Sequence, residues 1–128
     1  MSSFSWDDFL ALAEKLAIEA RQERNEGKRR TAIGRAYYAA FNQARTYAIS
    51  QRIVSSADEG SVHATLSRRL SEQSNREVAN VGNILRTLFK ARKHADYDLA
   101  PPCTDLHLDP ALRQARDILG RLTKLAAS

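Results

Sequence analysis

The chain has 128 residues and a net charge of +5, and 43% of its residues are hydrophobic while 27% are charged. This composition excludes an intrinsically disordered chain, and the length fits one domain, residues 1–128, with a buried core. A single cysteine, Cys103, excludes an internal disulfide, and there is no run of about 18 apolar residues of the kind that crosses a membrane. We therefore expect one cytoplasmic domain with no secretory leader and no membrane contact.

Glycine (5) and proline (3) are scarce, alanine is abundant, and β-branched residues form no alternating runs, so the composition predicts an all-α fold. The positive charge suits a polyanionic partner such as RNA, or an acidic protein surface. Scattered basic side chains also keep a protein soluble, so the charge alone leaves both interpretations open.

The first helix is predicted over residues 6–25. Ser5 and Asp8 have the spacing of a capping box, in which each side chain bonds a free backbone amide of the first turn. Gly27 is expected to end the helix in the left-handed conformation. The buried face is predicted from helical spacing and consists of Trp6, Phe9, Leu10, Ala13, Leu16, Ala17 and Ala20.

A second helix is predicted over residues 29–51 and a short third helix over 61–72, with a polar connection at 54–60. The second helix has an apolar face spaced for burial, which consists of Ile33, Tyr37, Ala40, Phe41, Ala44 and Ala48. The third helix is expected to bury Val62, Leu66 and Leu70.

A fourth helix is predicted to begin at Ser74, because Ser74 and Glu77 repeat the capping-box spacing. Gly82 lies on its apolar face and predicts a close crossing with a neighbouring helix. The other residues of that face are Val78, Val81, Leu85, Leu88 and Phe89.

Two prolines, Pro101 and Pro102, cannot continue this helix, so residues 95–108 are predicted to be irregular. Asp109 is predicted to cap a last helix that has Pro110 at its first position. The apolar stripe of the last helix is Leu112, Ala115, Ile118, Leu119, Leu122 and Leu125. Five helices with short connections favour an antiparallel up-and-down bundle.

A polar stripe follows the second helix, because Arg35, Tyr38, Asn42 and Arg45 are spaced by three, four and three residues. Two guanidiniums, a phenol and an amide on one line are groups that grip a phosphate or a carboxylate. An arginine-rich surface with a half-buried tyrosine is the alternative interpretation.

The densest polar cluster is at residues 90–98, the end of the fourth helix. Cations at a helix C-terminus complement the macrodipole, which is a structural explanation for Lys90, Arg92 and Lys93. Asp96 lies one helical turn after Arg92 and is placed to hold its guanidinium in a bidentate pair.

Two segments, Arg-Ala-Tyr-Tyr-Ala-Ala-Phe at 35–41 and Arg-Lys-His-Ala-Asp-Tyr-Asp at 92–98, together resemble the HEPN family, and most closely its small prokaryotic members. The resemblance covers residues 29–128. It implies a helical bundle that commonly forms a homodimer and is encoded beside a minimal nucleotidyltransferase, as toxin and antitoxin, or within a defence island. Many members are metal-independent ribonucleases, so no cofactor is expected.

The ribonuclease motif of that family is an Arg followed, after four to six intervening residues, by a His. In it the Arg holds the scissile phosphate and the His moves a proton. After Arg92 the corresponding positions hold Tyr97, Asp98 and Leu99. The nearest histidine, His94, is two residues away, a spacing that directs the two side chains to roughly opposite helix faces.

Two functions therefore stay open. The first is cleavage of RNA, in which Arg92 binds phosphate, His94, Tyr97 or Asp96 transfers the proton, and Arg35 and Lys93 extend the basic groove. The second is a non-catalytic module that uses the same face to bind a nucleotidyltransferase partner, a nucleotide or RNA. By resemblance, Tyr97 is also a candidate for modification by nucleotidylation.

A purely structural dimer, with Phe4, Trp6 and the last helix at its interface, is a third hypothesis. His63, His107 and Cys103 show no metal-ligand spacing, so no zinc site is expected. His63 is predicted to cap or pack at the start of the third helix.

Overall fold

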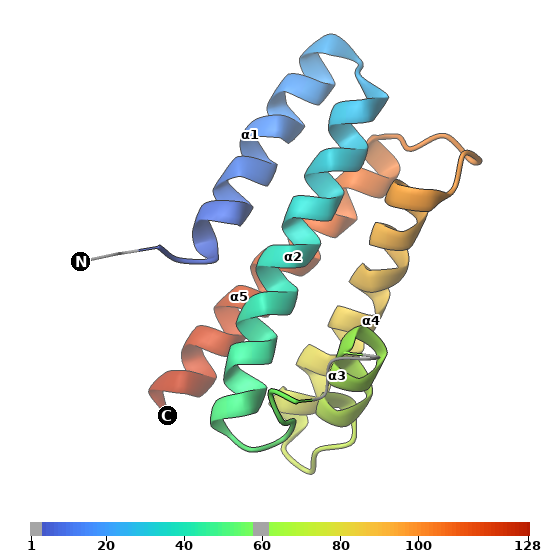
Figure 1. Ribbon diagram of the computed structural model, residues 1–128. Helices are drawn as coiled ribbons and strands as arrows, with labels where there is room; N and C mark the ends of the chain where they lie inside the picture. The colour runs from blue at the N-terminus through green and yellow to red at the C-terminus, as the bar shows by residue number, and fades with distance from the viewer. Residues whose placement is uncertain (1–3, 58–61) are drawn as a thin grey trace.

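The computed structural model describes residues 4–57 and 62–128, and within them the chain forms five helices and no strand. Four long helices alternate in direction and build an antiparallel bundle, with the short α3 beside the first half of α4 (Figure 1). The bounds are α1 Asp7–Glu23, α2 Glu26–Ser50, α3 Val62–Ser71, α4 Arg76–Tyr97 and α5 Asp105–Ala127. The predicted all-α bundle is confirmed. None of the helices in the described part is both long and apolar enough to cross a membrane.

The centre of the bundle is α2, which packs against each of the other helices. Its whole predicted face is buried, from Ile33 to Ala48, and alanine at many of these positions allows the neighbouring helices to approach closely. The predicted inner faces of α4 and α5 are also buried, except that Phe89 and Leu125 are only partly covered. Hydrophobic periodicity therefore identified the core of α2, α4 and α5, whereas Trp6, Phe9, Leu16 and Val62 of the other predicted faces are only partly buried.

The turn between α1 and α2 differs from its prediction. Arg24 ends α1 in the left-handed conformation (φ 53°), and Asn25 caps α2 by accepting a bond from the Lys28 amide. Gly27 therefore lies inside the first turn of α2, and its prediction as a helix stop was wrong. The reason is that the Asn25 side chain starts the new helix two residues before the glycine.

Helix α4 begins one residue later than the Ser74 capping box predicted. Asn75 is its N-cap and accepts bonds from the amides of Glu77 and Val78. The close crossing predicted from Gly82 is confirmed, since a Cβ atom on Gly82 would lie 2.4 Å from the Ser71 nitrogen of α3. The predicted start of the third helix at Ser61 lies outside the described residues.

The start of α5 was also predicted wrongly. Helix α4 continues to Tyr97 and α5 begins at Asp105, so Asp109 is not a cap and Pro110 lies inside the helix. Thr104 caps α5 in a box with His107, whose Nδ1 accepts from the Thr104 amide at 3.0 Å. A box with His instead of Glu or Gln does not have the usual sequence signature.

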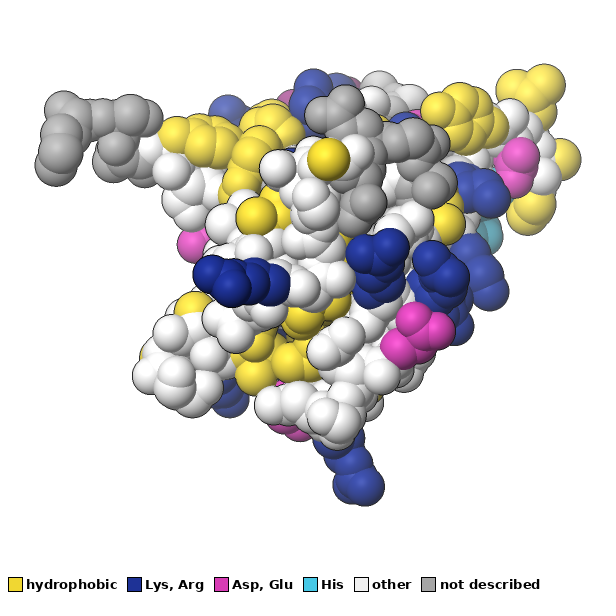
Figure 2. Space-filling view, turned by 60° about the horizontal axis from the view of Figure 1, so that its bottom comes forward, with side chains coloured by type: hydrophobic (Ala, Val, Ile, Leu, Met, Phe, Trp, Pro, Cys, Tyr) yellow, Lys and Arg dark blue, Asp and Glu magenta, His cyan; other side chains and the backbone are white. Residues whose placement is uncertain are grey.

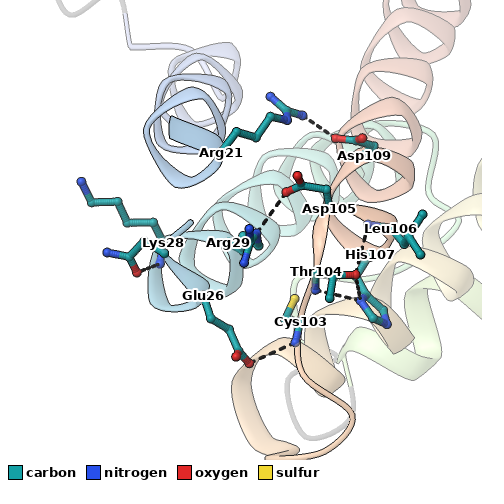
Figure 3. A network of polar contacts seen from close by, with 11 residues as sticks. Arg21, Glu26, Lys28, Arg29, Cys103, Thr104, Asp105, Leu106, His107 and Asp109 are labelled. Atoms are coloured by element: carbon teal, nitrogen blue, oxygen red, sulfur yellow. Dashed lines mark hydrogen bonds and ion pairs between the residues drawn. The ribbon is translucent and has the colours of Figure 1, made fainter. Parts of the chain in front are cut away.

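A polar network joins the α1–α2 turn to the start of α5 (Figure 3). Arg21 pairs with Asp109, and Arg29 pairs with Asp105 at 3.0 Å. Glu26 accepts a hydrogen bond from the Cys103 amide, and this bond, together with Arg30, lowers the pKa of the Glu26 carboxyl. The connection between α4 and α5 is thereby fixed against α2.

Candidate functional site

The end of α4 is held against α2 by Arg30. The Arg30 guanidinium donates to the carbonyl oxygens of His94 and Ala95 at 3.0 and 2.9 Å, and these carbonyls belong to the last turn of α4. A cation there satisfies free carbonyl groups and complements the helix dipole. The last turn of α4 is therefore fixed in position relative to α2.

Four side chains near the end of α4 form a group that we name the Arg92 cluster: Arg92, Asp96, Tyr38 and Tyr97. The Nη2 atom of Arg92 donates to the Tyr38 hydroxyl at 2.9 Å and lies 3.5 Å from the Tyr97 hydroxyl. Its guanidinium carbon is 5.3 Å from the ring centre of Tyr38 and 5.4 Å from that of Tyr97. Only 13% of the side chain is exposed, so its position is set by contacts on several sides.

The predicted pair between Arg92 and Asp96 is present as an ion pair, with Nε 2.8 Å from Oδ2. The Nε–H bond does not point along this line, so the buried Nε has no well-aligned hydrogen-bond acceptor. The Asp96 carboxylate has more lone pairs than this contact uses, so it keeps acceptor capacity for other donors. Such a fixed cation with incompletely used donors can bind an anionic oxygen.

Behind Arg92 lies an imidazole that sequence reasoning did not assign to the site. His63 of α3 is 2.5 Å from the Tyr37 hydroxyl through Nδ1, and its ring is parallel to Phe89 at 5.2 Å. Arg92 is close to the same tyrosine, with its guanidinium carbon 6.0 Å from the Tyr37 ring centre. No local spacing could predict this pair, because α2 and α3 are separate helices joined by a long connection, residues 51–61.

Burial lowers the pKa of His63, and the nearby Arg92 lowers it further. Burial also raises the pKa of Tyr37 above its usual range. Both groups therefore favour their neutral forms in the folded protein at neutral pH. A neutral imidazole beside a fixed guanidinium is available as a proton acceptor.

The lowered pKa of His63 predicts a pH-dependent stability. The unfolded chain, with a His pKa of about 6.5, binds the proton more readily than the folded one, so this contribution is lost as the pH falls below about 6.5. We expect the difference in free energy of unfolding between the parent and His63→Gln to shrink between pH 7.5 and pH 5.5, measured by urea denaturation. A difference that stays constant over that range would show that His63 titrates alike in both states.

His94, one of the predicted proton carriers, lies on a different side of α4 from Arg92. Its Nε2 is 2.7 Å from the Pro101 carbonyl oxygen, and its ring is 4.9 Å from that of His107. These contacts hold it at the α4–α5 connection. The structure therefore brings Asp96 and Tyr97 to Arg92, but not His94.

The predicted stripe on α2 is only partly assembled into the site. Tyr38 contacts Arg92 and Arg35 lies one turn away, over the Phe9 ring at 5.5 Å. Asn42 donates to the Tyr38 carbonyl of its own helix, and Arg45 donates to the Ser56 carbonyl at 3.4 Å. Lys93, also predicted, is exposed, and its ammonium is 5.4 Å from the centre of the Phe89 ring.

Beside the Arg92 cluster is a surface hollow of about 210 Å³, which we name the Gly34 cleft. It is lined by Thr31, Gly34, Arg35, Tyr38 and Asp96, so it shares two residues with the cluster. Gly34 forms part of its wall without a side chain. The cluster and the cleft together form one continuous polar region between α2 and the end of α4.

A basic surface lies toward the other end of α4. Figure 2 turns this end of the bundle toward the viewer, and Lys and Arg side chains are more prominent on it than Asp and Glu. Its exposed arginines include Arg52, Arg68, Arg76 and Arg86. Across residues 4–57 and 62–128, no three His, Cys, Asp or Glu side chains are grouped so that they could hold a metal ion.

A family model described as HEPN domain matches residues 6–125. The chain belongs to the HEPN domain family. No curated protein and no solved structure matches it significantly. Membership agrees with the helical bundle. At the level of the family it suggests a ribonuclease or a module associated with a nucleotidyltransferase, and members often work as dimers or with partner proteins. In this HEPN domain Arg92 is at the centre of the candidate site, whereas the nearby imidazole, His63, comes from α3.

Proposed function

We propose that this HEPN domain is the RNA-binding component of a prokaryotic toxin–antitoxin or defence module, and that Arg92 holds an RNA phosphate. The observation that carries the proposal is the preorganised Arg92, which is mostly buried and is fixed by Tyr38 and Asp96. A phosphate oxygen is a stronger acceptor than a phenol, so it can take over a guanidinium donor that now faces a tyrosine hydroxyl.

The charge distribution supports RNA over a neutral ligand. The protein has a net charge of +5, and exposed arginines on α3 and α4 form a further basic surface toward the other end of α4 from the Arg92 cluster. A homodimer would double this surface, and a nucleotidyltransferase-type partner could cover it. Tyr97, with 69% of its surface exposed, is accessible for nucleotidylation by such a partner.

A second candidate function, metal-independent cleavage of RNA, is favoured by one observation, the neutral His63 near Arg92. In this reaction a base takes the proton of a ribose 2′-hydroxyl, the 2′-oxygen attacks phosphorus, and the 5′-oxygen leaves with a proton from an acid. Arg92 would stabilise the charge on the phosphoryl oxygens. His94 does not face Arg92, so His63 is the better placed imidazole for this reaction.

The experiment that tests the proposal is titration of the protein into fluorescently labelled single-stranded RNA without divalent metal, at several salt concentrations. We expect saturable binding. The logarithm of the association constant should fall linearly with the logarithm of the salt concentration, with a slope of about 0.7 for each phosphate contacted. We also expect the RNA to stay intact in the same samples.

Absence of RNA binding at low salt would contradict the proposal. Products with 2′,3′-cyclic phosphate ends that disappear in His63→Gln would establish the second candidate instead. Products that persist in both His63→Gln and Arg92→Ala would identify a contaminating nuclease.

A further inference from the structure

Gly34 occupies a position where the fold does not require glycine. It lies in the middle of α2, and none of the described glycines has a positive φ, so its backbone is one that any L-residue adopts. A Cβ atom there would meet only Asp96 Oδ1, at an ordinary contact distance of 3.6 Å. Alanine would therefore fit and would favour the helix more. By contrast, the glycine at 82 is required by backbone contact.

Because Gly34 has no side chain, the Gly34 cleft stays open along this part of its wall. The cleft is beside the Arg92 cluster, because Tyr38 and Asp96 line both. A helix glycine that no packing contact requires, and that also borders a polar cleft, indicates a functional constraint. The constraint that the geometry points to is close approach of a ligand to the α2 backbone at Gly34.

The polar groups around the cleft include both donors and acceptors. The Arg35 guanidinium makes no ion pair or hydrogen bond within the described part of the chain and only stacks over Phe9. Asp96 directs Oδ1 toward Gly34 while Oδ2 faces Arg92. The Thr31 hydroxyl donates to the Gly27 carbonyl, so its oxygen remains an acceptor. A complementary ligand presents donors to the carboxylate and acceptors to the guanidinium.

We propose that the Gly34 cleft binds a guanine base, with Arg92 holding a phosphate of the same single-stranded RNA; this rests on the proposed RNA binding. Guanine presents N1–H and N2–H₂ as adjacent donors for the Asp96 carboxylate, and O6 and N7 as acceptors for Arg35. Adenine has an amino group but no neighbouring ring N–H, and uracil has a single ring N–H. The Tyr38 ring lines the cleft and supplies an aromatic contact to the base.

The test uses five-nucleotide RNAs that differ only in the central base, guanine or adenine, with inosine and 7-deazaguanine as further probes. We expect the parent to bind the guanine RNA about tenfold more tightly than the adenine RNA, since a good bidentate pair discriminates by that factor or more. Inosine lacks the N2 amino group and 7-deazaguanine lacks N7, so each should lose part of the preference.

Two glycine variants separate the function of the cleft from the stability of the helix. Gly34→Ala should raise the melting temperature yet bind the guanine and adenine RNAs equally. Gly120→Ala is the matched control, because a Cβ on Gly120 meets nothing within 4 Å, and it should raise the melting temperature and keep the guanine preference. Asp96→Asn should also lose the preference, because the amide no longer accepts both guanine donors.

A full guanine preference in Gly34→Ala would overturn the proposal, and so would a parent protein that binds both RNAs equally well. A parent that binds no RNA would instead contradict the proposed function. Guanosine monophosphate, used as a competitor, tests the source of the base. If guanosine monophosphate displaces the labelled RNA at the same concentration as the unlabelled guanine pentanucleotide does, the cleft binds a free nucleotide and the RNA part of the proposal is wrong.

Discussion

Replacing Gly82 with alanine should destabilise the protein by about 3 kcal/mol, the largest effect on stability that we expect of any single added methyl group. The new Cβ would lie 2.4 Å from the Ser71 nitrogen, 2.7 Å from the Ser67 carbonyl oxygen and 2.9 Å from the Leu70 carbonyl carbon. All three are backbone atoms of α3, so the clash is relieved only by moving that helix off α4. The measurement is the free energy of unfolding from urea denaturation.

The control for this substitution is again Gly120→Ala, on the exposed side of α5. There alanine adds helix propensity without a contact, and we expect a gain of about 0.5–1 kcal/mol. The same chemical change should therefore have opposite signs at two helical positions. A Gly82→Ala protein as stable as the parent would mean that α3 does not pack on α4 as closely as the structure shows.

Loss of α3 packing would also reach the site, because α3 carries His63. The imidazole lies between Phe41, at 4.4 Å between ring centres, and Phe89. Its contact with Tyr37 connects α3 to the residue that precedes Tyr38, the direct partner of Arg92. The close crossing at Gly82 thus holds α3, and with it His63, in place beside the residues that contact Arg92.

The helices and their buried faces could be predicted because they depend on local periodicity. Ile33, Leu85 and Ile118 are each buried as their spacing required. Helix ends were less predictable, because side chains such as Asn25 and Thr104 compete with glycine and proline for the boundary. Pro110 has no N–H group, so the Leu106 carbonyl lacks its usual helical donor. Leu106 is an exposed residue, so water can bond this carbonyl instead, and the proline is tolerated inside α5.

The residues of the site also differ in how far they could be predicted from the sequence. Arg92 and Asp96 are one turn apart on one helix, so their pairing was predictable from spacing alone. Tyr38 could be linked to them only through the family resemblance, since it is on another helix. His63 and Gly34 were missed because their roles depend on how α3 and α4 lie against α2, which no local pattern encodes. His94 was a candidate by proximity in sequence, and helix geometry directs it elsewhere.

Arg92→Ala should weaken binding of single-stranded RNA by about 30-fold or more, because charge-assisted hydrogen bonds contribute about 1.5–3 kcal/mol each. Arg92→Lys should lose most of the same affinity, since a lysine keeps the charge but not the planar fork that Tyr38 and Asp96 orient. The measurement is the change in fluorescence anisotropy of labelled RNA at low salt, with circular dichroism to verify the helix content of each variant.

Lys93→Ala is the matched control, because it removes the same charge one residue further along α4 from an exposed side chain. An exposed charge is screened by water and salt, so its loss should weaken binding only about two- to threefold. Equal losses in Arg92→Ala and Lys93→Ala would mean that RNA detects only the net charge of this surface. A much larger loss at Arg92 would show that the orientation of its guanidinium, set by α2, is what the RNA phosphate requires.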